Sequence, residues 1–315
     1  MKKFLIALLV IGILLAIAGG IIFGVSYSKA KMDTNIETKT YDIEEVFTNF
    51  EFDVDISDVE FKVSEDGKTK VEVKETEDYA HIVKVEDGTL KVKQQDDRKW
   101  YNRVFVFNLG SMKVTVYMPA GAYGDLNVDA STGYIRIPHD FSFNSINLDL
   151  STGDMYISSN VVNTLKIKAS TGDANLSDMT AKNIDLHAST GKANFSNVQV
   201  EETIKVDLST GKTIFENVTA KNYVHESSTG KVNLKNVIIA EEMDLETSTG
   251  AITFEDCDAA RITIKTDTGD VRGTLLTAKI FSVRTDTGKF DVPTSTEGGL
   301  CKIDTDTGNV SIQIK

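Results

Sequence analysis

A triplet of the form Ser/Asp-Thr-Gly is the motif of this sequence best suited to chemistry. It occurs ten times between Ser131 and Gly308, and the last three copies begin with Asp267, Asp286 and Asp306 instead of serine. An aspartate in such a triplet can supply one half of a carboxylate pair, in which two aspartates share a proton and work as acid and base. That chemistry needs two triplets that face each other across a cleft.

The spacing of the triplets favours a structural role instead. Successive triplet glycines are 19 or 20 residues apart, and a fixed period of this kind indicates a repeat architecture. In a stack of repeats the three aspartates form a column along one edge, which offers no cleft for the site of an aspartic protease. Glycine accepts positive φ at a corner and lets neighbouring units approach closely. The predicted turn glycines are Gly133, Gly153, Gly172, Gly191, Gly211, Gly230, Gly250, Gly269, Gly288 and Gly308.

The other two residues of the triplet also suit a corner. Serine or aspartate can hydrogen-bond to the backbone of a turn. Threonine at the same place in every unit predicts a column whose hydroxyls pair between neighbouring units. We therefore interpret the triplet as a corner-turning device and not as ten copies of a catalytic site.

Apolar residues alternate with polar residues on both sides of each triplet. Counted from the glycine, positions −7, −5, +2 and +4 are mostly apolar, and around Gly172 they are Leu165, Ile167, Ala174 and Leu176. A period of two predicts strands, and the apolar spacing of three and four that helices show is absent. The predicted fold class is therefore all-β, a β-solenoid of about ten coils with a period of 19–20 residues.

A third apolar position follows seven residues after the glycine. Its occupants are Met179, Val198, Val218, Val237, Cys257 and Leu276. Cys257 here and Cys301 at position −7 are predicted to be small core residues, because neither has the C-x-x-C partner of a zinc or redox site. His225 occupies position −5 and is predicted to be a core histidine bonded to a backbone or hydroxyl group. We predict no metal site and no cofactor.

The N-terminal residues predict a membrane anchor. After Lys2 and Lys3, the 22-residue stretch Phe4–Val25 carries no charge. As a helix it reaches ~33 Å, enough for a bilayer core of ~30 Å. A cleaved signal peptide has a shorter apolar core and a clear cleavage site. We therefore predict that residues 1–31 form a cytoplasmic stub and an uncleaved transmembrane helix, with the bulk of this single-pass cell-membrane protein extracytoplasmic.

Residues 32–112 lack the triplet but alternate in the same way. Because the end units of solenoids are usually atypical, we predict a β-rich N-terminal cap that continues into a repeat domain over 113–315. The cap contains the single tryptophan, in a basic and aromatic run. Trp, Tyr and Arg dominate binding hot spots, so this run is a candidate partner contact, and the alternative is a hairpin loop with one ring folded onto the cap. The candidate residues are Arg98, Trp100, Tyr101 and Arg103.

The C-terminal end of the repeat leaves two alternatives open. The chain stops at Lys315, half a coil after the last triplet. Exposed strand edges invite pairing with other strands. Either Lys315 and the short last strand blunt this edge, or the end meets a partner or another copy.

The sequence resembles a known bacterial family. The strand VTVYMPAG, the following LNVDASTGYIRI and the run of STGD, STGK and DTGD turns resemble the β-strand-repeat family described as "putative adhesins" of unknown function, which includes the membrane-anchored LiaG-like proteins of Gram-positive bacteria. The resemblance covers nearly all of the chain after the anchor. It implies a β-solenoid fold and a setting near cell-envelope stress systems, and it carries over no catalytic motif.

These observations predict a binding or scaffolding protein. A net charge of −13 argues against nucleic-acid binding, which needs a basic surface. Polysaccharide lyases place clustered basic and acidic catalysts on one β-helix face, whereas Lys166, Lys205 and Lys265 recur without such a cluster. We expect a non-enzymatic, membrane-anchored surface at the cell envelope, adhesin-like or accessory to the envelope stress response, for an envelope polymer or a membrane protein partner. The alternative is a scaffold that self-assembles end to end through open solenoid edges.

Overall fold

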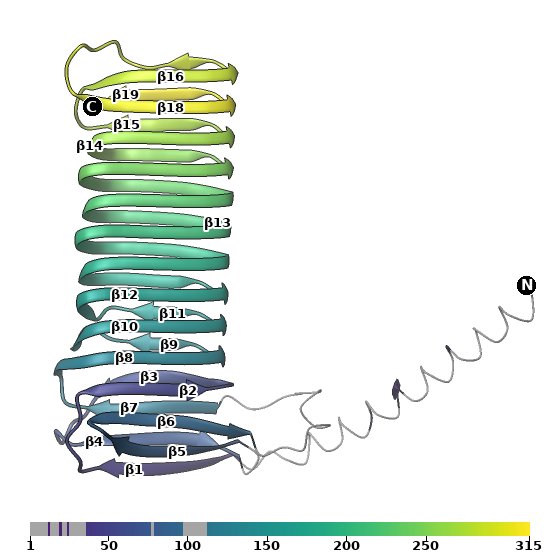
Figure 1. Ribbon diagram of the computed structural model, residues 1–315, viewed down its shortest axis with the longest axis vertical. Helices are drawn as coiled ribbons and strands as arrows, with labels where there is room; N and C mark the ends of the chain where they lie inside the picture. The colour runs from purple at the N-terminus through teal and green to yellow at the C-terminus, as the bar shows by residue number, and fades with distance from the viewer. Residues whose placement is uncertain (1–11, 13–18, 21–23, 25–35, 77–78, 97–111) are drawn as a thin grey trace, which may run out of the picture.

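The protein has an all-β fold (Figure 1). The computed structural model describes residues 12, 19–20, 24, 36–76, 79–96 and 112–315. No helix within these ranges combines the length and the apolarity that crossing a membrane requires. The predicted anchor Phe4–Val25 lies outside the described residues, apart from the four glycines at positions 12, 19, 20 and 24.

The described strands follow one another with short connections. β13 is much longer than the others because the chain stays extended around several corners. The strands are β1 (Glu37–Ile43), β2 (Asn49–Val54), β3 (Ser57–Val63), β4 (Thr69–Glu75), β5 (Tyr79–Glu86), β6 (Thr89–Asp96), β7 (Met112–Met118), β8 (Gly121–Thr132), β9 (Ile135–Ile137), β10 (Phe141–Thr152), β11 (Met155–Ile157), β12 (Asn160–Thr171), β13 (Ala174–Thr249), β14 (Ile252–Thr268), β15 (Val271–Leu275), β16 (Lys279–Thr287), β17 (Phe290–Asp291), β18 (Gly299–Thr307) and β19 (Val310–Ile314).

Successive repeats stack in parallel, one repeat length apart. Leu126 of β8 pairs with Ile146 of β10, which pairs with Leu165 of β12, which pairs with Ile184 of β13. The short strands stack in the same way, β9 on β11 and β11 on β13. Each coil therefore makes its backbone hydrogen bonds to the coils before and after it, and the result is the straight, solenoid-like stack of Figure 1.

One continuous hydrophobic core runs through the stack. The alternating residues predicted to point inward, such as Leu165, Ile167 and Leu176, are buried in it. Cys257 and Cys301 are free and buried, as predicted. Burial raises the pKa of the Cys257 thiol to about 11 and that of Cys301 to about 12, so both thiols stay protonated and unreactive.

The stack begins before the first triplet. β2 pairs in parallel with β8, and β3 pairs in parallel with β9, so Asn49–Val63 makes a rung that lacks the triplet. Antiparallel strands then finish this end: β4 on β7, β1 on β4, and β5 on β6. The predicted domain boundary at residue 112 stays a prediction.

At the other end, the spatial order of the coils differs from the chain order. β14 pairs with β18 and β18 pairs with β16, while β19 lies between β15 and β17. The last coil is thus inserted, and β16 with β17 ends the stack (Figure 1). The expectation that the last strand forms the exposed edge is therefore wrong. Instead, the Lys315 N–H donates to the Leu275 carbonyl at 2.9 Å, and its Nζ lies 2.5 Å from Asp256 Oδ2.

Leu276 is a second correction. Predicted at the third apolar position, it is 39% exposed, and Leu275 is buried in its place. The register of β14 and β15 shifts between Phe254 and Cys257, so that Cys257 pairs with Leu275. This coil is shorter by one residue at its second corner, which moves the inward position one residue earlier.

The second corner of the repeat holds an amide ladder that the sequence analysis missed. Six residues after the triplet glycine, five successive coils carry Asn or Asp with φ between 51° and 55°. Asn217 Nδ2 donates to Asn197 Oδ1 at 2.9 Å, and Asn236 Nδ2 donates to Asn217 Oδ1 at 3.0 Å. Asn and Asp are the residues apart from glycine that adopt this left-handed conformation most readily. The five are Asp178, Asn197, Asn217, Asn236 and Asp256.

Replacing Asn217 with alanine is expected to cost about 3 kcal/mol of unfolding free energy. Two side-chain hydrogen bonds of about 1 kcal/mol each are lost, and a Cβ-bearing residue without a polar group occupies left-handed space at a cost of about 1–2 kcal/mol. The N217G variant keeps the backbone conformation and serves as control, so it should lose about 1 kcal/mol less. Urea unfolding of both variants measures the difference, and equal losses would show that the backbone contributes nothing.

Candidate functional site: the triplet edge

Glycine in the triplet is required by close packing between coils. A Cβ built on Gly153 would lie far inside the contact distance of the Gly133 carbonyl oxygen, and the same holds for Gly211 against Gly191. The column begins at the Ser57 carbonyl below Gly133. At the far end of the column, Gly308 packs on the Gly269 carbonyl and Gly288 packs on the Gly308 carbonyl. This order, 269, 308, 288, agrees with the inserted coil. All ten predicted turn glycines thus form one continuous column.

Serine and threonine of the triplet form two exposed rows beside this column. Their neighbours in the stack are in register, for example Thr152 with Thr171 and Thr268 with Thr307. In spatial order the first row is Ser131, Ser151, Ser170, Ser189, Ser209, Ser228, Ser248, Asp267, Asp306 and Asp286. The second row is Thr132, Thr152, Thr171, Thr190, Thr210, Thr229, Thr249, Thr268, Thr307 and Thr287, and every member of both rows is exposed. We call these two rows the triplet edge.

The hydrogen bonds predicted for the triplet side chains are not the ones observed. Hydroxyls do pair between coils, but they belong to buried threonines two residues before the triplet threonine: Thr247 Oγ1 donates to Thr266 Oγ1 at 3.2 Å. In the part of the chain that the structure describes, no serine or threonine side chain of a triplet has a hydrogen bond. The glycine therefore serves the fold, whereas the hydroxyls of the triplet edge are free to face solvent or a ligand.

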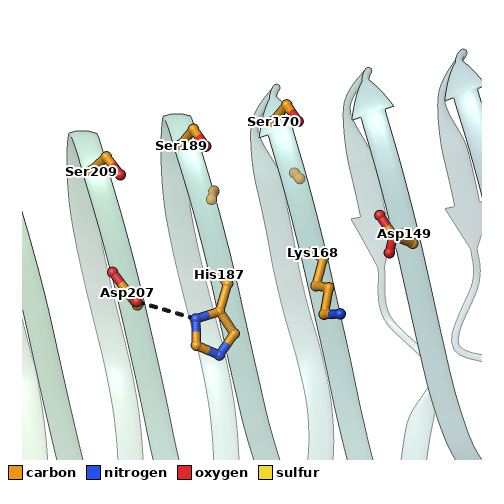
Figure 2. Close-up of a pocket in the computed structure, with 9 residues that line it drawn as sticks. Asp149, Lys168, Ser170, His187, Ser189, Asp207 and Ser209 are labelled. Carbon is orange, nitrogen blue, oxygen red and sulfur yellow. Dashed lines mark hydrogen bonds and ion pairs between the residues drawn. The ribbon is translucent and has the colours of Figure 1, made fainter.

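A row of charged side chains runs beside the serine row, two residues earlier in each repeat. Between them lies a shallow groove of about 360 Å³, lined by Asp149, Lys168, His187 and Asp207 of the charged row and by three of the serines. Figure 2 shows the serine and charged rows side by side on successive strands. The groove is open and is lined by charged side chains, serines and the alanines Ala169 and Ala188, and it suits a ligand lying across several coils rather than an enclosed small molecule.

His187 is the residue of this groove that could act as a base towards a serine. Its Nε2 lies 2.8 Å from Asp185 Oδ1 and its Nδ1 lies 3.2 Å from Asp207 Oδ2. A catalytic histidine needs one nitrogen directed at the nucleophile and the other at the orienting carboxylate. Nδ1 is hydrogen-bonded to Asp207 of the next coil, and the group nearest Nε2 is the Asp185 carboxylate and not a serine hydroxyl. His187 is thus placed as a bridge between two coils and not as a base for Ser189.

A second histidine has the contacts of a triad but is buried. His81 Nε2 lies 3.1 Å from Ser57 Oγ, and His81 Nδ1 lies 3.0 Å from Glu75 Oε2. The backbone N–H of His81 donates to the same carboxylate, and Lys39 Nζ pairs with its other oxygen. All three triad-like residues are at least 96% buried. A nucleophile needs access for its substrate, so this network ties β3, β4 and β5 together at the closed end of the stack.

The protonation of this network follows from burial. Desolvation lowers the pKa of His81 below its ordinary value, and the bond to Glu75 only partly opposes it. Burial raises the pKa of Glu75, but the bonds from Lys39 and His81 outweigh this and hold the pKa below its ordinary range. The stable arrangement is a neutral His81 beside an ionised Glu75. Neither the sequence spacing of 57, 75 and 81 nor any motif around them indicates the contact.

The other residues considered from the sequence fall as follows. Asp267, Asp306 and Asp286 stand in one row along the edge, as predicted, and not on two loops facing a cleft. His225 is buried with Nε2 3.2 Å from Ser227 Oγ, the hydroxyl contact that was predicted. Within the described ranges, no three His, Cys, Asp or Glu side chains gather to hold a metal ion. The predicted contact residues Arg98, Trp100, Tyr101 and Arg103 lie outside the described residues.

Solved structures share this fold. A "putative lipid binding protein" from Parabacteroides distasonis is 19% identical, with a TM-score of 0.51 over 76% of this chain and 97% of that one. "Putative adhesins" from Bacteroides fragilis and Parabacteroides merdae are each 16% identical, with TM-scores of 0.43 and 0.40, over 76% and 89% of this chain and 97% of each of theirs. The first likeness, at 19% identity, shows the fold alone, and the two with TM-scores below 0.5 add nothing to it.

The family assignment comes from the sequence. No curated protein matches the chain. Two overlapping stretches, residues 47–211 and 199–315, match the family model described as Toastrack DUF4097. Together they cover the stack from its first rung to its last, and they confirm the resemblance to a β-strand-repeat family of adhesin-like proteins. The chain belongs to the Toastrack DUF4097 family.

Proposed function

We propose that this chain is a non-enzymatic binding protein, anchored in the cell membrane by Phe4–Val25, whose triplet edge holds an extended, hydroxyl-rich polymer of the cell envelope. The observation that carries the proposal is the pair of exposed, in-register hydroxyl rows without hydrogen bonds of their own. A side chain kept free at every rung is available to bind a ligand that repeats along the same axis.

The geometry of the edge suits a long ligand. Strands in a sheet are ~4.8 Å apart, so ten triplets present threonine hydroxyls over ~43 Å, and the first seven present serine hydroxyls beside them over ~29 Å. Each rung except the last, β16 with β17, is hydrogen-bonded on both sides within the stack, so the row does not have to be ordered when a ligand binds. Single hydroxyl contacts are weak, but a polymer that touches many of them at once gains through multivalency. The charged row beside them can select among polymers by their charge.

A binding role is supported over a catalytic one by the two histidine sites. Both nitrogens of His187 face carboxylates, and Ser57 beside His81 is buried. The name of the "putative lipid binding protein" suggests a lipid as a different ligand. The groove beside the serine row, however, is lined by charged residues and serines, with Ala169 and Ala188 as its apolar members, which offer little surface to an acyl chain. A role as accessory to an envelope stress system, through a membrane protein partner, remains a proposal that follows from the resemblance.

The test uses the full chain in lipid vesicles and purified peptidoglycan as the probe. S170A/S189A/S209A removes three hydroxyls from the centre of the triplet edge. At about 1 kcal/mol per hydrogen bond, the loss of three contacts should weaken binding roughly 100-fold. A co-sedimentation assay measures the affinity, and flotation of the same vesicles checks the anchor.

The matched control removes three exposed hydroxyls that lie away from the edge, in T219A/T294A/S311A. Surface changes of this kind alter stability by less than about 0.5 kcal/mol, so both triple variants stay folded. The control should bind like the unchanged chain. Equal binding by both triple variants, or no binding by the unchanged chain, contradicts the proposal.

Self-association is the second candidate, and one observation favours it. The last coil in space, β16 with β17, has a neighbouring coil on one side only among the described strands.

A further inference from the structure

The far end of the stack is an open end of the hydrophobic core. β16 pairs with β18 and β17 pairs with β19, and no other described strand pairs with either. The backbone groups on the other side of β16 therefore point away from the stack. Inward-facing side chains of this coil are covered from one side: Phe281 and Val283 are only half-buried, and Phe290 is 58% exposed. Equivalent positions inside the stack, such as Cys301 under Phe281, are buried.

The other end of the stack has a different construction. Its outermost strands, β1 and β5, run antiparallel to their neighbours. Tyr41, Ile43, Val83 and Val85 pack from these strands against the core. Because β5 runs against the direction of the stack, a second molecule finds no complete parallel rung at this end on which its own open end could continue the stack. An interface that joins unlike ends and repeats gives filaments, whereas one that joins like ends closes at two copies.

We propose that two copies of this chain pair tip to tip, through antiparallel contact of the two β16 strands about a two-fold axis. Such pairing satisfies free backbone groups along the second half of both β16 edges and covers the adjoining part of both open core ends. It goes beyond the proposed polymer binding and does not depend on it. It also replaces end-to-end polymerisation with a closed pair.

The charges on β16 fix the register. In an antiparallel pair centred on Thr285, residue 284 of each copy lies opposite residue 286 of the other. Arg284 then faces Asp286 of the second copy, twice by symmetry, and oppositely charged residues placed directly across two strands attract. Both side chains are exposed and point away from the core, paired within one copy at 3.2 Å by a contact that solvent screens. Val283 faces Thr287 of the second copy on the inner side.

The shape of the tip agrees with this register. The loop 293–298 rises past the end coil on the side opposite the triplet corner (Figure 1). It leaves open the half of β16 that ends at Thr287, which is the half containing Arg284 and Asp286. A pair centred on Thr285 uses this open half.

The contact is small, so the pair is expected to be weak in dilute solution. A register centred on Thr285 overlaps residues 283–287 of the two strands. Five residues at ~3.3 Å and two sheets ~10 Å apart cover about 170 Å² per copy. Stable interfaces bury about 800 Å² per partner. Many copies facing one another from two membranes would act together, as multivalent contacts do.

The test uses full chains reconstituted singly into lipid nanodiscs, so that their membrane segments cannot meet. Sedimentation equilibrium at rising concentration should give a monomer–dimer equilibrium. In a pair of two R284D chains, an aspartate at 284 faces Asp286 of the other copy. In a pair of two D286R chains, an arginine at 286 faces Arg284 of the other copy. Because like charges repel, each variant alone should dimerise roughly tenfold more weakly or worse.

Mixing the two variants is the decisive arm. In a mixed pair every residue 284 again faces an opposite charge at 286, so R284D with D286R should dimerise like the unchanged chain. Neither variant regains its own Arg284–Asp286 contact, so restoration by mixing reports pairing between copies. The S170A/S189A/S209A variant should dimerise normally, which separates this proposal from polymer binding. Filaments, monomers at every concentration, or no rescue on mixing would each overturn the proposal.

Discussion

Replacing Gly230 with alanine is expected to destabilise the stack by about 4 kcal/mol or more. The added Cβ would overlap the carbonyl oxygen of Gly211 in the neighbouring coil. Relief would require the two rungs to separate where they are hydrogen-bonded. Losses of this size are characteristic of overpacking that the surrounding structure cannot relax. Guanidinium unfolding of the variant measures the loss.

A second glycine separates this effect from backbone strain. Gly67 has a φ of 71° at a turn, with nothing within 4 Å of the position a Cβ would take. The G67A variant therefore carries the cost of left-handed backbone alone, about 1–2 kcal/mol. Gly230 is in the opposite situation, since the close approach and not its φ excludes a side chain. Equal losses of unfolding free energy in G230A and G67A would show that neighbouring coils can accommodate a methyl group at the glycine column.

His225 is expected to make the fold acid-sensitive. Burial lowers its pKa from 6.5 to about 4 in the folded chain, although Asp207 opposes the shift. Between these values the unfolded chain binds a proton that the folded chain excludes, so stability falls as the pH falls. One pKa unit corresponds to 1.36 kcal/mol, so the free energy of unfolding should fall by about 3 kcal/mol between pH 6.5 and pH 4. Above pH 6.5 His225 is neutral in both states and causes no loss. His81, whose pKa is also lowered, adds to it in the same direction.

The H225L/S227A variant should flatten this dependence. Leucine matches the apolar residues at the same position of neighbouring coils, and alanine avoids leaving the Ser227 hydroxyl without its partner. The change also removes the buried Nδ1, which has no hydrogen-bond partner among the described residues, so stability at pH 7 should not fall. Urea midpoints at pH 7 and pH 4.5 give the comparison. His139 is exposed, and H139Q, which should leave the slope unchanged, is the control.

The sequence was sufficient for the features that repeat locally. Alternation around each triplet identified the strands, and the constant glycine spacing identified the corner. Both signals come from neighbours in the chain, so no distant contact had to be known. The amide ladder at the second corner, from Asp178 to Asp256, was equally regular. It could have been found, because Asn or Asp recurs six residues after the triplet glycine.

The features that were missed depend on which distant strands meet. β16 and β18 both end in Thr-Asp-Thr and both match β14 in register, so local sequence does not determine which of them pairs with it. The contact of Ser57, Glu75 and His81 comes from three strands whose order in the cap has no repeat to guide it. The triplet was only partly predictable. The close packing of its glycine was expected from the sequence, but the exposure of its hydroxyls could be seen only in the assembled stack.

The inserted coil means that the order of stacking is not the order of synthesis. Gly299–Ile314 leaves the ribosome after β16 and β17, yet it lies beneath them. The end coil can reach its final place only when the last residues of the chain exist to support it. A chain that terminates early at Val292 would have to stack β16 directly on β14, with a different surface at its tip. The surface at this end of the stack therefore depends on Gly299–Ile314, which is made after the coil that it supports.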